Sequence, residues 1–153
     1  LNLHANGDGA IDAFLRAHEQ AAAGDLGKER NVTMIHSQFV RKDQLDKYVT
    51  YKIRPSLYTL HTYYFAEAHI ANRGRAQAMY VSPMRDAIDK GLVPTNHTDF
   101  VVAPLDQMFM MWRGDRRGPA RDAARGAEGD DDQRRSAVRR TVVEGLAGSG
   151  QAG

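Results

Sequence analysis

The stretch Val32-Thr33-Met34-Ile35-His36-Ser37-Gln38 decides how the rest of the chain is interpreted. It is a short apolar run, rich in β-branched residues, that stops at a histidine. A run of this length is typical of a strand buried on both faces, as in a parallel sheet covered by helices. His36 then lies at the carboxyl end of its strand, where open α/β sheets and β/α barrels carry their chemistry.

The same alternation of strand-like and helical segments continues on both sides of this stretch. Further strands are expected at residues 1–4, 53–57 and 93–97. Apolar residues at helical spacing predict helices near residues 8–23, 43–49, 84–90 and 105–112. An order of strand, helix and strand predicts parallel strands joined by crossovers, and therefore an α/β fold.

Three local signals refine these expectations. Asp8 suits the N-cap of the first helix, and Ser82 followed by Pro83 predicts the start of a later one. Pro55 favours an edge position for the third strand, because proline removes a ladder donor. The aromatic-rich segment 60–69 is compatible with either core packing or the wall of a binding pocket.

Composition excludes several classes of protein. The chain has 153 residues, enough for one domain with a real core, and no apolar run as long as the ~20 residues of a membrane span. It has no cysteine, so a metal site must use His, Asp or Glu. Through Trp112 there are 12 basic and 12 acidic residues, which argues against nucleic acid as a partner. No signal peptide is visible at Leu1, so we expect a cytoplasmic protein without a membrane partner.

The composition changes at Arg113. Residues 113–153 are dominated by Arg, Gly, Ala and Asp, and their few apolar residues cannot offset the entropy of ordering. We expect a domain at 1–112 and a tail at 113–153 that is disordered or not native to the fold. Our hypothesis is that a shifted reading frame in the gene produced this tail.

His4, His36 and Asp99 each stand at the carboxyl end of an expected strand. Two imidazoles and one carboxylate suit zinc or a similar divalent ion. His36 follows His4 by 32 residues, about one strand-helix-strand unit, so the two rings are expected at neighbouring strand ends.

Four motifs in order carry a resemblance to a known family. They are His4-Ala5-Asn6-Gly7-Asp8, Ile35-His36-Ser37-Gln38, Pro55-Ser56-Leu57-Tyr58 with His61-Thr62-Tyr63-Tyr64, and His97-Thr98-Asp99. Their order and separation resemble the second half of amidohydrolase family 3, the branch of the metal-dependent amidohydrolase superfamily that includes N-substituted formamide deformylases. The resemblance covers residues 1–112.

The resemblance implies a partial TIM-type (β/α)8 barrel made of strands five to eight. It implies a metal, most simply zinc, held by His4, His36 and Asp99, with Asp99 also moving the proton. A divalent ion lowers the pKa of bound water from 15.7 to about 7, and a carboxylate beside that water can accept its proton. The expected substrate contacts are His61, Tyr63 and His97, and the expected substrate is a small amide or formamide.

The resemblance also implies what this chain lacks. The superfamily's His-x-His pair on the first strand and its bridging residue on the fourth do not occur here, so the chain is expected to begin within a domain. The missing N-terminal half of the barrel is then a required partner, and self-association stays open. Half a barrel has exposed strand edges, so we expect an isolated chain of low stability, weak metal binding and little or no turnover. Two alternatives remain: a non-catalytic barrel remnant that acts as a binding or scaffold module, and an enzyme for esters or phosphoesters.

Overall fold

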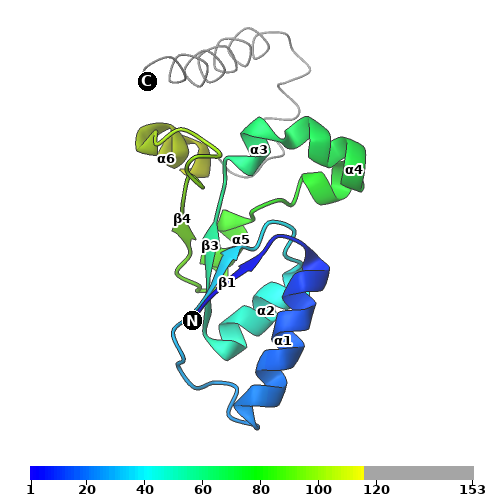
Figure 1. Cartoon of the computed structure of the whole chain (residues 1–153), viewed down its shortest axis with the longest axis vertical. Helices are drawn as coiled ribbons and strands as arrows, with labels where there is room; N and C mark the ends of the chain where they lie inside the picture. The colour runs from blue at the N-terminus through cyan, green and yellow to red at the C-terminus, as the bar shows by residue number, and fades with distance from the viewer. Residues whose placement is uncertain (116–153) are drawn as a thin grey trace, which may run out of the picture. The chain divides into compact units, whose positions relative to one another are not determined.

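The structure of the protein is a computed structural model, which describes residues 1–115 (Figure 1). The strands are β1 (Asn2–Ala5), β2 (Val32–His36), β3 (Ile53–Leu57) and β4 (Thr95–Asn96). The helices are α1 (Asp8–Ala22), α2 (Lys42–Tyr51), α3 (His61–Tyr64), α4 (Ala66–Ala78), α5 (Met84–Asp89) and α6 (Gln107–Asp115). The expected tail at 113–153 lies outside the described residues except for its first three.

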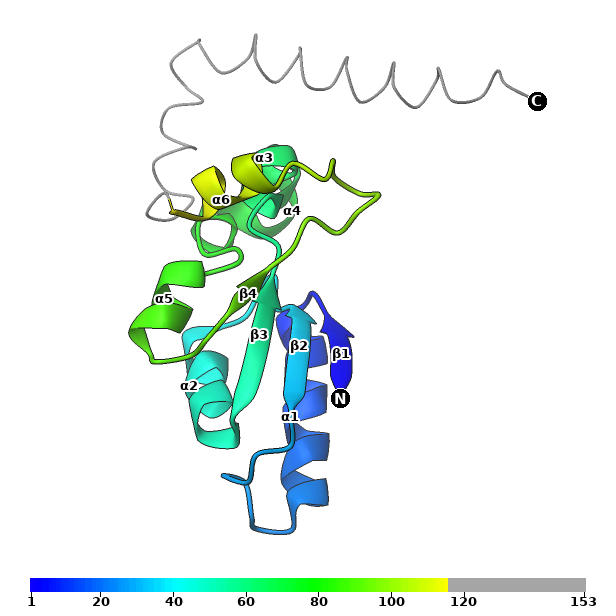
Figure 2. The ribbon, with the colours of Figure 1, turned by 90° about the vertical axis from the view of Figure 1, so that its left-hand side faces the viewer.

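The four strands form one parallel sheet in the order β1-β2-β3-β4 (Figure 2). The register places His4 beside Ile35, Ile35 beside Ser56, and Ser56 beside Thr95. The predicted parallel α/β fold is therefore confirmed, and four strands of this kind are consistent with part of a TIM-type barrel. Their assignment as strands five to eight stays a prediction.

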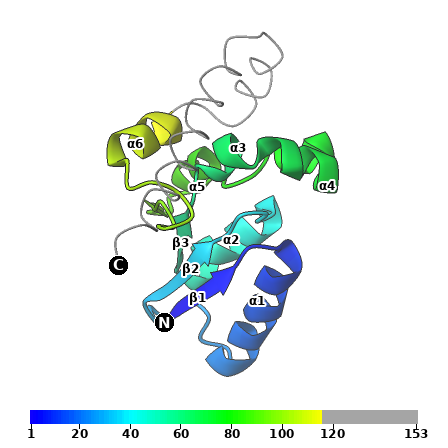
Figure 3. The same ribbon diagram turned by 45° about the horizontal axis from the view of Figure 1, so that its top comes forward.

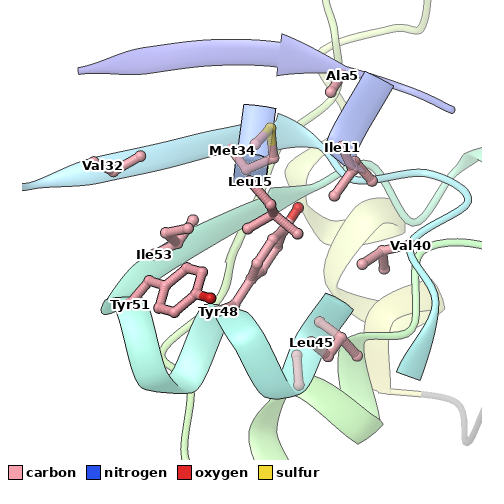
Figure 4. Packing of buried hydrophobic residues seen from close by; sticks show 11 residues of the cluster. Ala5, Ile11, Leu15, Val32, Met34, Val40, Leu45, Tyr48, Tyr51 and Ile53 are labelled. Carbon is pink, nitrogen blue, oxygen red and sulfur yellow. The ribbon is translucent and has the colours of Figure 1, made fainter. Parts of the chain in front are cut away.

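One face of this sheet packs against helices and forms the main core (Figure 4). Ile11 and Leu15 of α1 and Leu45 and Tyr48 of α2 are almost completely buried, as is Met34 of β2. Because strand side chains alternate between the two faces, Val32 and Met34 of β2 both join this core. Apolar burial on this face is the main source of stability for the described residues.

The opposite face of the sheet carries more exposed side chains. His4 and Arg54 are exposed, and Ile35 and Ser56 are half-buried. Parallel sheets normally have both faces covered. The polar side chains on this second face of the sheet, His4, Arg54 and Ser56, therefore remain at least partly accessible to solvent.

A polar contact joins α1 to α2 beside the core. The buried side chain of Gln44 accepts from the backbone N–H of Arg41 at 2.9 Å and donates to the Asp8 carbonyl at 2.8 Å and the Asp12 carboxylate at 2.7 Å. Arg41 donates through both terminal nitrogens to Asp12, each at 3.0 Å. Both helix N-termini are thereby fixed next to the strand ends that precede them.

Two predicted caps are wrong. Gly7 is the N-cap of α1, and the Asp8 carboxylate instead faces Arg41 at 3.6 Å. Pro83 is the N-cap of α5, and the hydroxyl of Ser82 instead donates to the Tyr58 carbonyl at 3.0 Å. In both cases the side chain that was expected to cap the helix interacts with a residue distant in the sequence.

Pro55 occupies an interior strand without disrupting it. β3 pairs with β2 along its length, but β4 pairs only with Ser56 and Leu57. Beside Pro55 the β4 side of β3 is therefore an open edge, where a missing donor is tolerated.

The connection between β3 and β4 contains more helix than the sequence predicted. α3 leads into α4 (Figure 3). α4 is interrupted at Gly74, where φ is 77°. Together with α6, these helices lie beyond the carboxyl ends of the strands (Figures 1 and 2). No helix among residues 1–115 is long and apolar enough to cross a membrane.

Candidate metal centre

The backbone at the end of β2 adopts an uncommon conformation. His36 and Ser37 have φ values of 70° and 46°, in the left-handed region that non-glycine residues rarely occupy. Ser37 is held there by its N–H, which donates to the Ala5 carbonyl at 3.0 Å, and by its hydroxyl, which lies 3.1 Å from the Tyr48 hydroxyl. Strained backbone conformations of this kind cluster at functional sites. Here the conformation of residues 36 and 37 sets the direction of the His36 ring.

His97 meets His36 across β3. Nε2 of His97 lies 3.1 Å from Nδ1 of His36, and Nδ1 of His97 lies 3.1 Å from the Ser56 hydroxyl. The backbone N–H of His97 donates to the Leu57 carbonyl at 3.0 Å, which extends the pairing of β3 with β4. The three side chains therefore form one line of contacts over three neighbouring strands.

Asp99 completes a group of three metal-binding side chains. One ligand atom from each of His36, His97 and Asp99 lies within 4.8 Å of the other two. Asp99 also has a positive φ, 52°. Two imidazole nitrogens and one carboxylate oxygen fit a divalent ion such as zinc. The residues present thus suit the metal that the sequence resemblance implied.

His4 lies next to this group but is not a member of it. Its ring stands edge-on to His36, with ring centroids 4.6 Å apart and planes at 87°. The residue is exposed, whereas His36 is buried. The structure therefore brings the two expected histidine ligands side by side, with His4 on the accessible face of the sheet.

His61 is a buried histidine of defined protonation. Ser82 donates its only hydroxyl proton to the Tyr58 carbonyl, so Nδ1 of His61, 3.4 Å from the Ser82 oxygen, must be the donor in that contact. Burial first, and then the neighbouring imidazoles His36, His69 and His97, lower the pKa of His61 to about 3. His61 is therefore neutral at physiological pH, with the lone pair of Nε2 as an acceptor.

Burial has the same effect on the two central rings. It lowers the pKa of His36, to which the neighbouring His97 also contributes, and it lowers the pKa of His97, against the opposing effect of Asp99. Neutral imidazole is the form that binds metal.

The other residues expected at the site are placed differently. The ring of Tyr63 packs edge-to-face against Tyr64 and Phe109, with centroids 5.1 Å away in both cases.

His69, for which the sequence suggested no role, also lies near the site. Its Nε2 is 2.7 Å from Nε2 of Gln38, and its ring centroid is 6.0 Å from that of His61. It thereby joins α4 to the segment that follows His36.

Sequence reasoning did not foresee the contacts that orient these rings. Ser56 and Ser82 are ordinary hydroxyl residues, and only the strand register and the β3–β4 connection bring them to the histidines. For His97 the sequence contained one indication of a place beside Asp99. Residues two apart on an extended chain share a side, and the two residues have that spacing.

Comparisons with known proteins identify the family of the chain. A search among curated proteins found no match. A solved structure, described as an uncharacterized metal-dependent hydrolase from Pyrococcus furiosus, is similar with a TM-score of 0.59 and 25% sequence identity over 73% of this chain. The present chain spans only 22% of that protein. The sequence profile of the amidohydrolase family matches residues 1–143, and the chain belongs to that family.

Proposed function

We propose that this chain is the metal-binding part of a hydrolase that cleaves non-peptide carbon–nitrogen bonds in small amides or formamides. The observation that carries the proposal is the convergence of His36, His97 and Asp99 at the carboxyl ends of parallel strands, with ligand atoms within 4.8 Å of one another. Family membership and the similarity to a metal-dependent hydrolase support the same chemistry. They do not favour a purely structural scaffold.

In this proposal His4 and His36 are metal ligands, Asp99 is both ligand and catalytic carboxylate, and zinc is the ion. When bound there, such an ion would supply an activated water and would polarise the substrate carbonyl. The Asp99 carboxylate would accept a proton during the attack of water and pass it to the nitrogen that leaves as the C–N bond breaks. His36 is held in place by the fixed backbone of residues 36 and 37.

Substrate contacts come from the β3–β4 connection. Neutral His61 presents an acceptor at Nε2, which suits an N–H group of an amide or formamide. Tyr63, together with the aromatic rings beside it, offers apolar surface for the rest of the substrate. His97 was expected to contact substrate as well, and its position beside His36 is compatible with that role.

A further part of this proposal is that the chain forms strands five to eight of a β/α barrel and acts together with an N-terminal half. The exposed face of the sheet and the 22% coverage of the similar hydrolase support it. The four described strands leave the inner layers of such a barrel unfilled. We therefore expect little or no turnover from the 153-residue chain alone.

The test compares the chain with a version extended upstream in its gene. Both are loaded with Zn²⁺ and assayed for release of formate or amine from N-substituted formamides and simple amides, with carboxylic and phosphoric esters as competing substrate classes. We expect hydrolysis of C–N bonds by the extended protein and its loss in Asp99→Asn. Metal content and turnover that survive His36→Ala in the extended protein would refute the proposal, and preferred cleavage of esters would refute its choice of bond.

A further inference from the structure

We propose that His97, oriented by Ser56, binds the metal directly together with His36 and Asp99, so that the ends of β2 and β4 supply three protein ligands. This inference rests on the proposed function only in assuming a divalent ion at the site. It gives His97 a role different from the substrate contact that the sequence suggested, and it assigns to His97 the ligand position that the proposed function gives to His4.

The separation of the two imidazoles carries the argument. Two nitrogens bound to a tetrahedral zinc at about 2.0–2.1 Å lie about 3.3 Å apart. Nδ1 of His36 and Nε2 of His97 lie 3.1 Å apart. The separation of the two nitrogens therefore differs by only a few tenths of an ångström from that of two ligands on one zinc ion.

Ser56 has the position of an orienting residue. Histidines that bind metal usually engage their second nitrogen with a polar group, which fixes both the tautomer and the ring orientation. The Ser56 hydroxyl, 3.1 Å from Nδ1, provides that contact for His97. Because Ser56 pairs with Thr95 in the sheet and His97 follows directly after β4, the ring is fixed from strand to strand.

Asp99 follows His97 by two residues, and a ligand atom of each lies within 4.8 Å of the other. Thr98, between them, is buried. The positive φ of Asp99 then turns the chain away immediately after the carboxylate. His97 and Asp99 therefore act as one ligand unit on the β4 side, opposite His36 on the β2 side.

The resulting set of three protein ligands leaves a coordination position open. Catalytic zinc sites commonly have three protein ligands and an open fourth position. His4, exposed and edge-on to His36, lies outside the group of three. The chain can therefore assemble a three-ligand site from the described residues without a His-x-His pair from elsewhere.

Cobalt binding provides a test that does not depend on activity. Co²⁺ is titrated into the purified chain, and affinity, stoichiometry and the visible d–d absorption are recorded, with circular dichroism as a check on folding. We expect Ser56→Ala to weaken Co²⁺ binding about 10–100-fold, as the loss of a residue that orients a metal ligand usually does. Ser56→Thr keeps the hydroxyl and should bind Co²⁺ as the unchanged chain does. His97→Ala and the bulkier His97→Gln should weaken binding more than Ser56→Ala does and alter the absorption, whereas His18→Gln, a buried histidine of α1, should do neither.

The outcomes separate this inference from the proposed function. Unchanged affinity and absorption in both His97 variants, with loss of binding in His36→Ala, would overturn the role of His97 and leave the hydrolase proposal standing. Unchanged binding in His36→Ala and in Asp99→Asn would overturn both.

Discussion

The link between Asp12 and Arg41 predicts a measurable dependence of stability on pH. Asp12 accepts both terminal nitrogens of Arg41 at 3.0 Å and the Gln44 amide at 2.7 Å. The hydrogen bonds from Arg41, and then that from Gln44, lower the pKa of Asp12 to about 2 from its ordinary 3.8. Asp12→Asn removes the charge while keeping the shape of the side chain.

The sign and size of the effect follow from this pKa. Because the folded value is depressed, ionised Asp12 stabilises the native state above the unfolded value, and the contribution disappears as the pH falls through the folded value. The full shift corresponds to about 2 kcal/mol. Since 33% of the Asp12 side chain is exposed, solvent screening reduces this to about 1 kcal/mol.

Urea unfolding of the purified chain, followed by circular dichroism, measures the effect. We expect Asp12→Asn to lower the free energy of unfolding by about 1 kcal/mol at pH 7, and by only about a third of that at pH 2.5. Asp25→Asn, which removes the same charge from an exposed loop, is the control and should change little at either pH. Equal destabilisation by Asp12→Asn at both pH values would refute the electrostatic explanation.

Three further outcomes are expected in the same unfolding assay. Leu45→Ala opens a cavity in the core and should cost about 2–5 kcal/mol, whereas Leu45→Met should cost less than about 1.5 kcal/mol; similar costs for the two would contradict the packing described. Gly91→Ala should destabilise the chain by about 1 kcal/mol, because φ of Gly91 is 80°. Gly9→Ala, in α1 with free space around it, should stabilise the chain by about 0.5 kcal/mol. The opposite signs would contradict the backbone conformation at these two glycines. Zn²⁺ at 100 times its Kd should raise the free energy of unfolding by about 2.7 kcal/mol, EDTA should reverse this, and His36→Ala should abolish it; a zinc effect that persists in that variant would place the ion elsewhere.

The sequence predicted the features of the fold that depend on local patterns. An apolar run that ends at His36 indicated a strand buried on both faces; β2 does end at that residue, but only alternate residues of it are buried. The regular spacing of apolar residues indicated α1 and α2, whose inward residues form the main core. A parallel sheet followed because strands and helices alternate along the chain.

The same local reasoning failed where a distant partner decides the outcome. Asp8 is a residue type that often caps helices, but its carboxylate lies 3.6 Å from Arg41, 33 positions later, and does not cap α1. Residues 66–78 give a weak helical signal because they are polar on most sides and contain Gly74, and α4 was therefore missed. The contact of His97 with His36 spans 61 positions and depends on the register of β4 against β3, which no local pattern encodes.

The two halves of the candidate site are anchored with different strength. Left-handed conformations of non-glycine residues cost about 1–3 kcal/mol each and persist only where surrounding contacts impose them. At His36 and Ser37 those contacts come from β1 and from Tyr48 of α2, within the main core. His97 and Asp99 depend instead on β4, a strand of two residues. An ion shared by His36 and His97 would therefore join the weakly held β4 to β2 across β3, so metal binding should order the β4 side of the site more than the β2 side.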